Sequence, residues 1–219
     1  PNIYTMKRTI LATAIFLLGV SGFAQQMATG YVFEDQNENG KKDRNESGIA
    51  NVSVSNSQQV VVTDTNGKYE IPVGDDNIIF VIKPSGYVPK INENNLPEFY
   101  YIHKPNGSPK SEFAGVKPTG KLPKSIDFGL IPSEEKETFT ALIFGDPQPY
   151  NLEEIEYFTK GIVTEVEGIK DVPFGLSLGD LVGNDLDLFS PYIKAVKKVG
   201  IPWYNLMGNH DMNFDATED

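Results

Sequence analysis

The chain has 219 residues, enough for two modest domains, and its 39% hydrophobic and 22% charged residues are ordinary for a folded protein. The formal net charge of −11 argues against nucleic-acid binding through a basic patch, because affinity for a phosphate backbone needs Lys and Arg. It does not exclude a phosphorylated substrate, since bound metal cations reverse the local sign of the charge.

A secretory signal peptide is predicted at residues 1–24. A basic pair at 7–8 precedes an apolar run at 9–20 and small residues that end at Ala24, and residues 1–5 read as sequence upstream of the natural start. The run is too short to span a bilayer, so a buried helix or a membrane anchor is the lesser alternative. We expect an exported protein (periplasmic, cell-surface or secreted) with no stable membrane span after cleavage. It has no cysteine and therefore no disulfides.

Residues 28–131 show short stretches rich in β-branched and aromatic residues, separated by turn signals. These stretches predict strands at 30–34, 51–55, 60–63, 68–71, 78–82, 99–102 and 126–130. About seven short strands in a hundred residues is typical of an all-β sandwich domain. Residues 105–123 are rich in Gly, Pro, Ser and Lys and predict a long loop, and the polar segment 132–137 predicts an interdomain linker.

One stretch of this domain fits the twelve-residue calcium-loop pattern D-x-D/N-x-D/N-G-x5-E at every specified position. Gly40 permits the sharp turn, while side-chain oxygens and one carbonyl would surround the ion. The predicted calcium ligands are Asp35, Asn37, Asn39, Lys41 (through its carbonyl), Asp43 and Glu46. The alternative is an ordinary polar hairpin loop, and the two Lys and one Arg in the loop would weaken calcium binding.

This loop, with residues 48–54 and 63–69, resembles the calcium-binding B-type repeats of bacterial surface adhesins. It is also similar to the N-terminal domain that precedes some exported calcineurin-like phosphoesterases. The resemblance covers residues 29–85 and implies a prealbumin-like or immunoglobulin-like sandwich. It implies nothing about catalysis.

From residue 138 onward, strand patterns alternate with helical patterns. Strands are predicted at 138–144, 173–178 and 202–207. The first helix should begin after Asn151 as its N-cap and carry apolar residues as far as Ile169, and the second should follow a Ser190 cap with Pro191 first. This β-α-β-α-β order predicts a parallel sheet. Because the chain ends soon after the third strand, we expect residues 138–219 to be an incomplete α/β domain.

Polar side chains follow each of these strands. Asp146 and Gln148 follow the first, Asp180 the second, and Asn209 the third. Ligands gather at the carboxyl ends of strands in such sheets, so these donors predict one shared site. Their oxygens suit Mn²⁺, Mg²⁺, Fe or Zn²⁺, and two such ions would activate hydroxide at neutral pH. Taken singly, each residue could equally be a turn or cap residue.

Gly145-Asp146-x-Gln148, Gly179-Asp180 and Gly208-Asn209-His210-Asp211 resemble the D-x-H, G-D and G-N-H-D/E blocks of calcineurin-like metallophosphoesterases. The resemblance implies that Asp146 and Gln148 hold one metal, Asp180 bridges both, and Asn209 holds the second. It implies that His210 acts on the substrate as general acid or transition-state donor, oriented by Asp211. Gln148 stands where the family usually has His. The later G-H-x-H block has no counterpart, so the chain is expected to be the front of a longer enzyme.

The expected function is therefore an exported, metal-dependent phosphoesterase acting on a phosphorylated small molecule or other phosphate ester. The alternative is a non-catalytic surface-binding protein whose calcium-stapled sandwich is the functional module. His103, the second histidine, is expected to be structural or on the surface. The substrate, the identity of the metals and the oligomeric state are left open.

Overall fold

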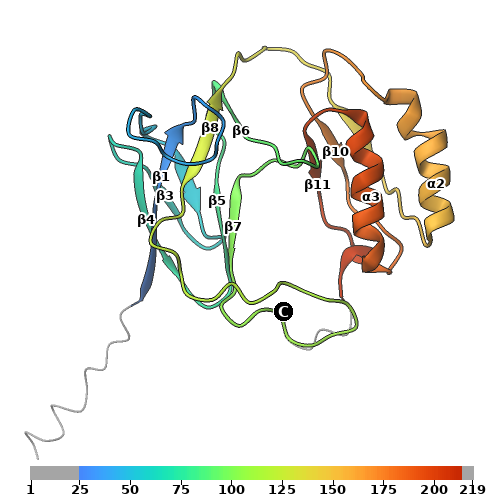
Figure 1. Ribbon diagram of the computed structural model, residues 1–219, viewed down its shortest axis with the longest axis horizontal. Helices are drawn as coiled ribbons and strands as arrows, with labels where there is room; N and C mark the ends of the chain where they lie inside the picture. The colour runs from blue at the N-terminus through green and yellow to red at the C-terminus, as the bar shows by residue number, and fades with distance from the viewer. Residues whose placement is uncertain (1–24, 214–219) are drawn as a thin grey trace, which may run out of the picture.

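The structure is a computed structural model that describes residues 25–213, so the predicted signal peptide at 1–24 lies outside the described residues. Figure 1 shows an N-terminal part built of strands and a C-terminal part with helices, joined by a segment that runs over the top. Within residues 25–213, no helix is long and apolar enough to cross a membrane.

The N-terminal part consists of two four-stranded sheets with the orders β4-β1-β8-β6 and β3-β2-β5-β7. Its strands are β1 Gln26–Glu34, β2 Ser53–Ser55, β3 Val60–Val62, β4 Lys68–Val73, β5 Asn77–Val81, β6 Tyr87–Pro89, β7 Tyr100–His103 and β8 Phe128–Pro132. All pairs are antiparallel except β1 with β8. This mostly-sheet part is consistent with the predicted β-sandwich.

Alternation along the strands puts one face of each sheet into a shared core. In β4, the buried Tyr69, Ile71 and Val73 alternate with more exposed neighbours. They pack with apolar residues of both sheets. A period of two in burial is what a sheet with one covered face requires. His103 is buried at the end of β7, and neither of its ring nitrogens has a hydrogen-bond partner among residues 25–213.

In the N-terminal part, two strands depart most from the prediction. β1 begins at Gln26, four residues earlier than predicted, because it continues its pairing with β4 as far as Val73. β6 was not predicted, since it is short and ends in Pro89. It lies at the edge of its sheet, where a proline without an N–H is tolerated.

The C-terminal part is built on a parallel three-stranded sheet of order β11-β10-β9. Its elements are β9 Leu142–Phe144, α2 Leu152–Gly161, η1 Val163–Val166, β10 Gly175–Ser177, η2 Leu186–Leu188, α3 Phe189–Val196, η3 Lys197–Val199, β11 Trp203–Asn205 and η4 Asn209–Asp211. Figure 1 shows α2 and α3 on the side of this sheet away from the N-terminal part.

The first helix has the predicted start but ends early. The side chain of Asn151 accepts a hydrogen bond from the Glu154 N–H at 2.9 Å, which confirms Asn151 as the N-cap. The predicted end at Ile169 is wrong, because α2 stops at Gly161. The β-branched residues that follow are poor helix formers, and the chain continues as the 3₁₀ helix η1.

The second helix begins earlier than predicted. η2 runs directly into α3, and the side chain that caps this helical run is Asp185, which accepts from the Asp187 N–H at 3.0 Å. The predicted Ser190 cap is therefore wrong. Pro191 lies in the first turn of α3, where its missing N–H loses no helical bond.

The two parts are in contact through the segment between β6 and β7. The Trp203 N–H donates to the Asn95 carbonyl at 2.9 Å, and the Asn95 side chain donates to the Lys197 carbonyl at 3.1 Å. Leu96 packs against the core of the C-terminal part. The N-terminal part thus covers the open edge of β11, which would otherwise present unpaired backbone groups.

Candidate metal centre

The turns that follow β9, β10 and β11 lie against one another. The Gln148 N–H donates to the Asp180 carbonyl at 2.9 Å, and the Leu206 N–H donates to the Ser177 carbonyl at 2.9 Å. The His210 N–H reaches the Asp180 side-chain Oδ1 at 3.0 Å. Asp180, in the middle, therefore contacts both neighbouring turns.

Two glycines make this approach possible. A Cβ on Gly208 would lie 2.0 Å from Asp180 Oδ1, which real Cβ atoms do not tolerate. Gly179 has a φ of +97°, and a Cβ there would lie 2.9 Å from the Gly208 nitrogen. Only residues without a side chain allow the turns after β10 and β11 to pack this closely.

Three of the four predicted metal ligands have a left-handed backbone. φ is 51° at Asp146, 41° at Gln148 and 47° at Asp180. Residues other than glycine rarely adopt this region, and holding one there costs on the order of 1–3 kcal/mol. Such conformations cluster at binding and catalytic sites, so this set of outliers marks the strand ends for function.

Each predicted ligand has an uncommitted oxygen. Within the described range, the side chains of Asp146 and Asn209 make no hydrogen bond, and neither Asp146 nor Asp180 makes an ion pair. The Gln148 amide nitrogen donates to the Tyr150 hydroxyl at 3.2 Å, and its amide oxygen has no partner among residues 25–213. A carboxylate that has an uncommitted oxygen and no countercharge is available to bind a cation.

Asp211 does not have the predicted partner. It is 8% exposed, and its Oδ1 accepts from the Leu181 and Val182 N–H groups at 2.8 and 3.2 Å. Its Oδ2 accepts from the Gly208 N–H at 2.8 Å. The expectation that Asp211 orients His210 is therefore wrong. Both carboxylate oxygens are committed to backbone donors, and Asp211 joins the turn after β10 to the turn after β11.

The partner of His210 is Asn184. The His210 Nδ1 lies 2.8 Å from the Asn184 Oδ1, and the ring meets Tyr150 edge-on with centroids 6.4 Å apart. Asn184 is itself left-handed, with φ of 72°. Neither Asn184 nor Tyr150 was predicted as a site residue from the sequence. The position of Asn184, four residues after Asp180 in the same turn, was the signal that could have identified it from the sequence.

A buried hydrogen-bond network connects β10, β11 and α3 beneath the strand-end turns. The Ser177 hydroxyl lies 2.5 Å from the Tyr192 hydroxyl and accepts from the Trp203 indole N–H at 2.9 Å. Burial raises the pKa of Tyr192 to about 12. The network ties β10 to β11 and α3, so it fixes the strands from which the site turns emerge.

The predicted calcium loop has its first and last acids turned inward. Asp35 is fully buried and accepts from the Gly40 N–H at 2.7 Å, and Glu46 is 4% exposed and accepts from the Asp43 N–H at 2.8 Å. Buried carboxylates that accept backbone N–H bonds hold the loop in a fixed curve.

The middle of the loop is a cluster of polar side chains. The amide nitrogens of Asn37 and Asn39 both donate to Asp43 Oδ2, at 2.9 and 3.0 Å, and the Lys41 N–H donates to Asn39 Oδ1 at 2.6 Å. Among the described residues, no group of three or more His, Cys, Asp or Glu side chains is arranged to hold a metal, here or at the strand ends. Calcium binding therefore stays a prediction.

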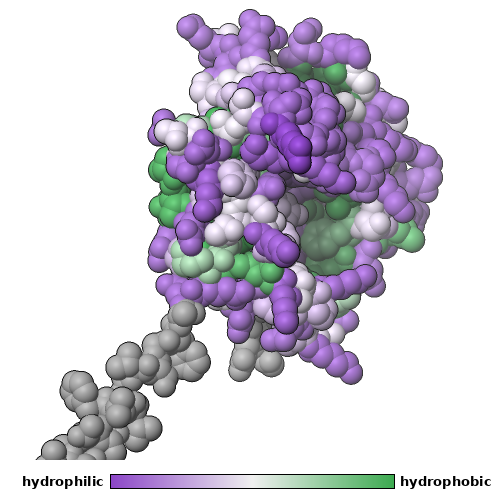
Figure 2. Space-filling view, turned by 60° about the vertical axis from the view of Figure 1, so that its left-hand side comes forward, coloured by the Kyte–Doolittle hydropathy of each residue, from purple (hydrophilic) through white to green (hydrophobic). Residues whose placement is uncertain are grey.

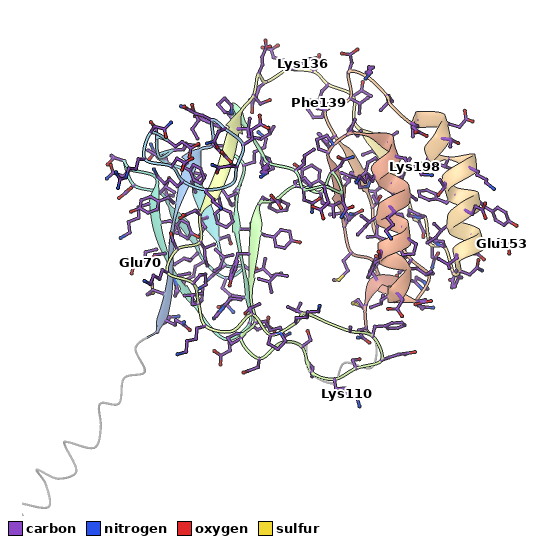
Figure 3. All side chains as sticks on the ribbon, in the orientation of Figure 1. Glu70, Lys110, Lys136, Phe139, Glu153 and Lys198 are labelled. Carbon is purple, nitrogen blue, oxygen red and sulfur yellow. The ribbon has the colours of Figure 1, made fainter. Side chains whose placement is uncertain are left out.

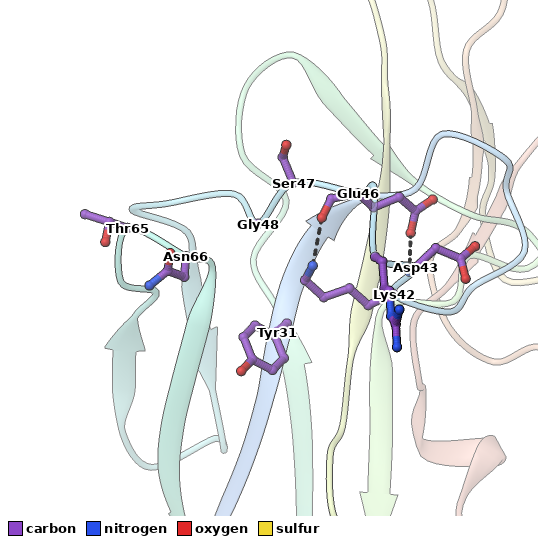
Figure 4. Close-up of a pocket in the computed structure, with 9 residues that line it drawn as sticks. Tyr31, Lys42, Asp43, Glu46, Ser47, Gly48, Thr65 and Asn66 are labelled. Carbon is purple, nitrogen blue, oxygen red and sulfur yellow. Dashed lines mark hydrogen bonds between the residues drawn. The ribbon is translucent and has the colours of Figure 1, made fainter.

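A pocket of about 590 Å³ lies beside this loop, as Figure 4 shows. Lys42 crosses it, with its ammonium group 2.8 Å from the Glu46 carbonyl and 5.7 Å from the centre of the Tyr31 ring. The charge of Lys42 is thus engaged by a carbonyl and an aromatic ring on the pocket side of the loop.

Comparison with known families gives one match. Residues 36–117 match the family model described as the N terminal of calcineurin-like phosphoesterase. No curated protein matches the chain. The match supports the family predicted from the N-terminal residues. It covers the predicted calcium loop except for its first residue, Asp35, and ends within the long loop, so the residues of the strand-end site lie beyond the matched range.

Proposed function

We propose that the chain is part of an exported calcineurin-like phosphoesterase that hydrolyses phosphate esters at a dinuclear metal centre. In this proposal, residues 28–131 are a sandwich domain, 132–137 a linker, and 138–219 the front of the catalytic domain. The observation that carries it is the meeting of three strand-end turns around Asp180, in a chain whose residues 36–117 match the N-terminal domain of that family.

The donor set fits divalent metals. Carboxylate and amide oxygens are uncommitted at the strand ends and have no cationic partner among the described side chains, which is the chemistry that Mn²⁺, Fe, Zn²⁺ or Mg²⁺ requires. Asp146 and Gln148 would hold one ion, Asp180 both, and Asn209 the second. Bound there, two cations supply Lewis acidity and offset the charge of the ester phosphate.

His210 is the proposed proton donor to the leaving oxygen. Because the Asn184 side-chain oxygen accepts at Nδ1, Nε2 is the nitrogen left to face the substrate. Asn184 acts through His210 and is therefore a positioning residue. Asp211 contributes by holding the backbone on which Asp180 and His210 stand.

The experiment is phosphate release from an aryl phosphate by the full-length gene product, with Mn²⁺ and after chelation. The Asp180→Asn variant should lose activity by about 100-fold, since it weakens the shared ligand. Asp187→Asn, which removes an exposed acid in η2, is the matched control. Activity that survives both the chelator and Asp180→Asn would refute the metal centre.

Calcium would stiffen the N-terminal domain of this exported protein. At calcium a hundred times its dissociation constant, binding stabilises the folded state by about 2.7 kcal/mol, which should raise the melting midpoint by several degrees. Glu46→Gln should abolish this rise, whereas Glu38→Gln, an exposed acid of the same loop outside the ligand pattern, should keep it. An equal midpoint with calcium and with chelator would argue for an ordinary polar loop.

A second function is a non-catalytic surface-binding protein. The observation favouring it is that both the family match and the calcium loop lie in the N-terminal part. If the gene product releases no phosphate with any divalent metal while the N-terminal part binds a surface ligand, this second function replaces the first.

A further inference from the structure

The long loop between β7 and β8 carries a charge opposite to that of the chain. Its only acid between residues 104 and 124 is Glu112, and its lysines are Lys104, Lys110, Lys117, Lys121 and Lys124. Lys104 pairs with Asp76 at 2.8 Å. Lys110, Lys117, Lys121 and Lys124 are exposed and make no ion pair with any residue of the described chain. We refer to residues 104–124 as the lysine loop.

The lysine loop lies against the strand-end site. The Ser111 hydroxyl donates to the Asn213 side-chain oxygen at 2.7 Å, and the Asn213 amide donates to the Phe113 carbonyl at 3.0 Å. Asn213 follows His210 by three residues, so their Cα atoms are at most about 11 Å apart. Figure 1 shows the loop crossing from the N-terminal part to below the strand ends, and Figure 3 shows Lys110 at its lower tip.

The loop has internal bonds that hold this shape. The Ser108 N–H donates to the Val116 carbonyl at 2.8 Å, and the Val116 N–H returns a bond to the Ser108 hydroxyl at 3.0 Å. Nearer its base, the Thr119 N–H donates to the Lys104 carbonyl at 3.1 Å. The pairing at Ser108 and Val116 therefore closes the outer segment that carries Lys110 and reaches the site, and Lys117 directly follows this pairing.

We propose that the lysine loop is the outer wall of the substrate site and binds a second anionic group of the phosphate ester. This inference rests on the proposed function. The strand-end centre takes the ester phosphate, and Lys110 and Lys117 determine specificity by attracting a carboxylate or a further phosphate elsewhere on the same molecule.

Charge favours this role. Charges closer than about 8–10 Å are poorly screened at physiological ionic strength, so a lysine side chain of this loop that reaches within that distance of the site would act on an anion held there. An ammonium group on a flexible stem suits a loosely positioned anion better than a rigid fork. The chain as a whole has a net charge of −11, whereas this loop has five lysines and one acid, so the loop is a part of the chain that would attract an anion.

The test uses two substrates that differ by one anionic group, phenyl phosphate and 4-carboxyphenyl phosphate, with the full-length gene product and Mn²⁺. The measured quantity is the ratio of kcat/KM for the carboxylated ester to kcat/KM for the plain ester. In Lys110→Glu/Lys117→Glu, this ratio should fall about tenfold, because local enrichment of an anion by a charged surface is of that order. Differences in leaving group cancel between variants.

The control is Lys68→Glu/Lys198→Glu, which makes the same change of charge at two exposed lysines away from the site. Figure 3 places Lys198 at the upper end of α3, opposite the lysine loop. This control should leave the ratio within about twofold of the parent, because exposed charges beyond the Debye length are largely screened. Raising the salt concentration should lower the parent's ratio toward that of the loop variant.

An unchanged ratio in an active Lys110→Glu/Lys117→Glu enzyme would overturn the inference and leave the proposed function standing. An equal fall in the control would also overturn it, since only the total charge would then matter. If the unsubstituted enzyme releases phosphate from neither ester, both the proposed function and this inference are refuted.

Discussion

Asp211→Asn tests whether Asp211 fastens two turns rather than serving His210. The substitution keeps an oxygen that can accept from Leu181 and Val182, as Oδ1 does now. It replaces the other oxygen with an amide nitrogen that faces the Gly208 N–H, donor against donor. One charge-assisted bond is lost, and a partly buried N–H is left unsatisfied.

The expected loss follows from these contacts. Hydrogen bonds to charged groups contribute roughly 1.5–3 kcal/mol, and an unsatisfied buried donor costs roughly 1–3 kcal/mol. Because these two figures overlap in counting the same lost bond, we expect Asp211→Asn to lower the unfolding free energy by about 2–3 kcal/mol. That is a large share of the 5–15 kcal/mol of a typical domain.

Urea unfolding followed by tryptophan fluorescence measures this loss directly. Trp203 is the only tryptophan, and it is 1% exposed in β11, the strand that leads to Gly208. Its signal therefore reports on the C-terminal part. Asp187→Asn is the control with the same change of charge at an exposed site. A stability loss below about 0.5 kcal/mol, the range of ordinary surface substitutions, would refute the fastening role.

Three further predictions concern the same turns. Gly208→Ala places a Cβ 2.0 Å from Asp180 Oδ1 and should weaken Mn²⁺ binding by at least about tenfold in calorimetric titration, whereas Gly161→Ala, which meets nothing within 4 Å, should not. Asn184→Ala should lower kcat of the gene product by about tenfold with little change in KM, since it frees the His210 ring; an unchanged kcat would argue against the positioning role. Burial raises the pKa of Tyr192 from 10 to about 12, so the unfolded chain releases this proton first and stability falls between pH 10 and 12, by up to about 2.7 kcal/mol. Urea midpoints at pH 8 and pH 11.5 should differ less in Tyr192→Phe than in the parent, and equal differences would contradict the assignment.

Much of the architecture could be predicted because it depends on local pattern. Alternation of apolar residues located most strands of the N-terminal part, and helical spacing with the Asn151 cap located the start of α2. Most strand positions depend on which face is buried, and burial leaves a readable period in the sequence. The short edge strand β6 leaves no such period, which is why it was missed.

The partner of Asp211 could not be read from sequence. Adjacent His and Asp residues suggest a side-chain pair, but Gly208 lets the turns after β10 and β11 approach closely, and the carboxylate meets the backbone of Leu181 and Val182 instead. Backbone donors have no residue-type signature, so bonds to them leave no trace in a motif. Asn184 was missed for a related reason, since its role depends on a left-handed turn after Asp180.

The exposure of apolar side chains also could not be predicted from the sequence, because it depends on the folded structure. Figure 2 shows a face that is mostly hydrophilic, with apolar side chains in several patches, one of which lines a hollow. In the described part of the C-terminal sheet, Leu178, Leu206 and Met207 are at least half exposed although they flank apolar strands. A strand pattern in the sequence identifies the apolar positions. It does not show which of the two faces of the sheet is covered by helices.

The contact between Asn95 and Trp203 affects whether the two parts of this polypeptide can be expressed as separate fragments. In a fragment that begins within residues 132–137, the edge of β11 would lose its hydrogen bond to the Asn95 carbonyl. The apolar core against which Leu96 packs would also become exposed. A strand edge with unpaired backbone groups pairs readily with strands of other chains. Expressed alone, residues 138–219 should therefore self-associate, and supplying the N-terminal half in trans should return them to solution as a stoichiometric pair.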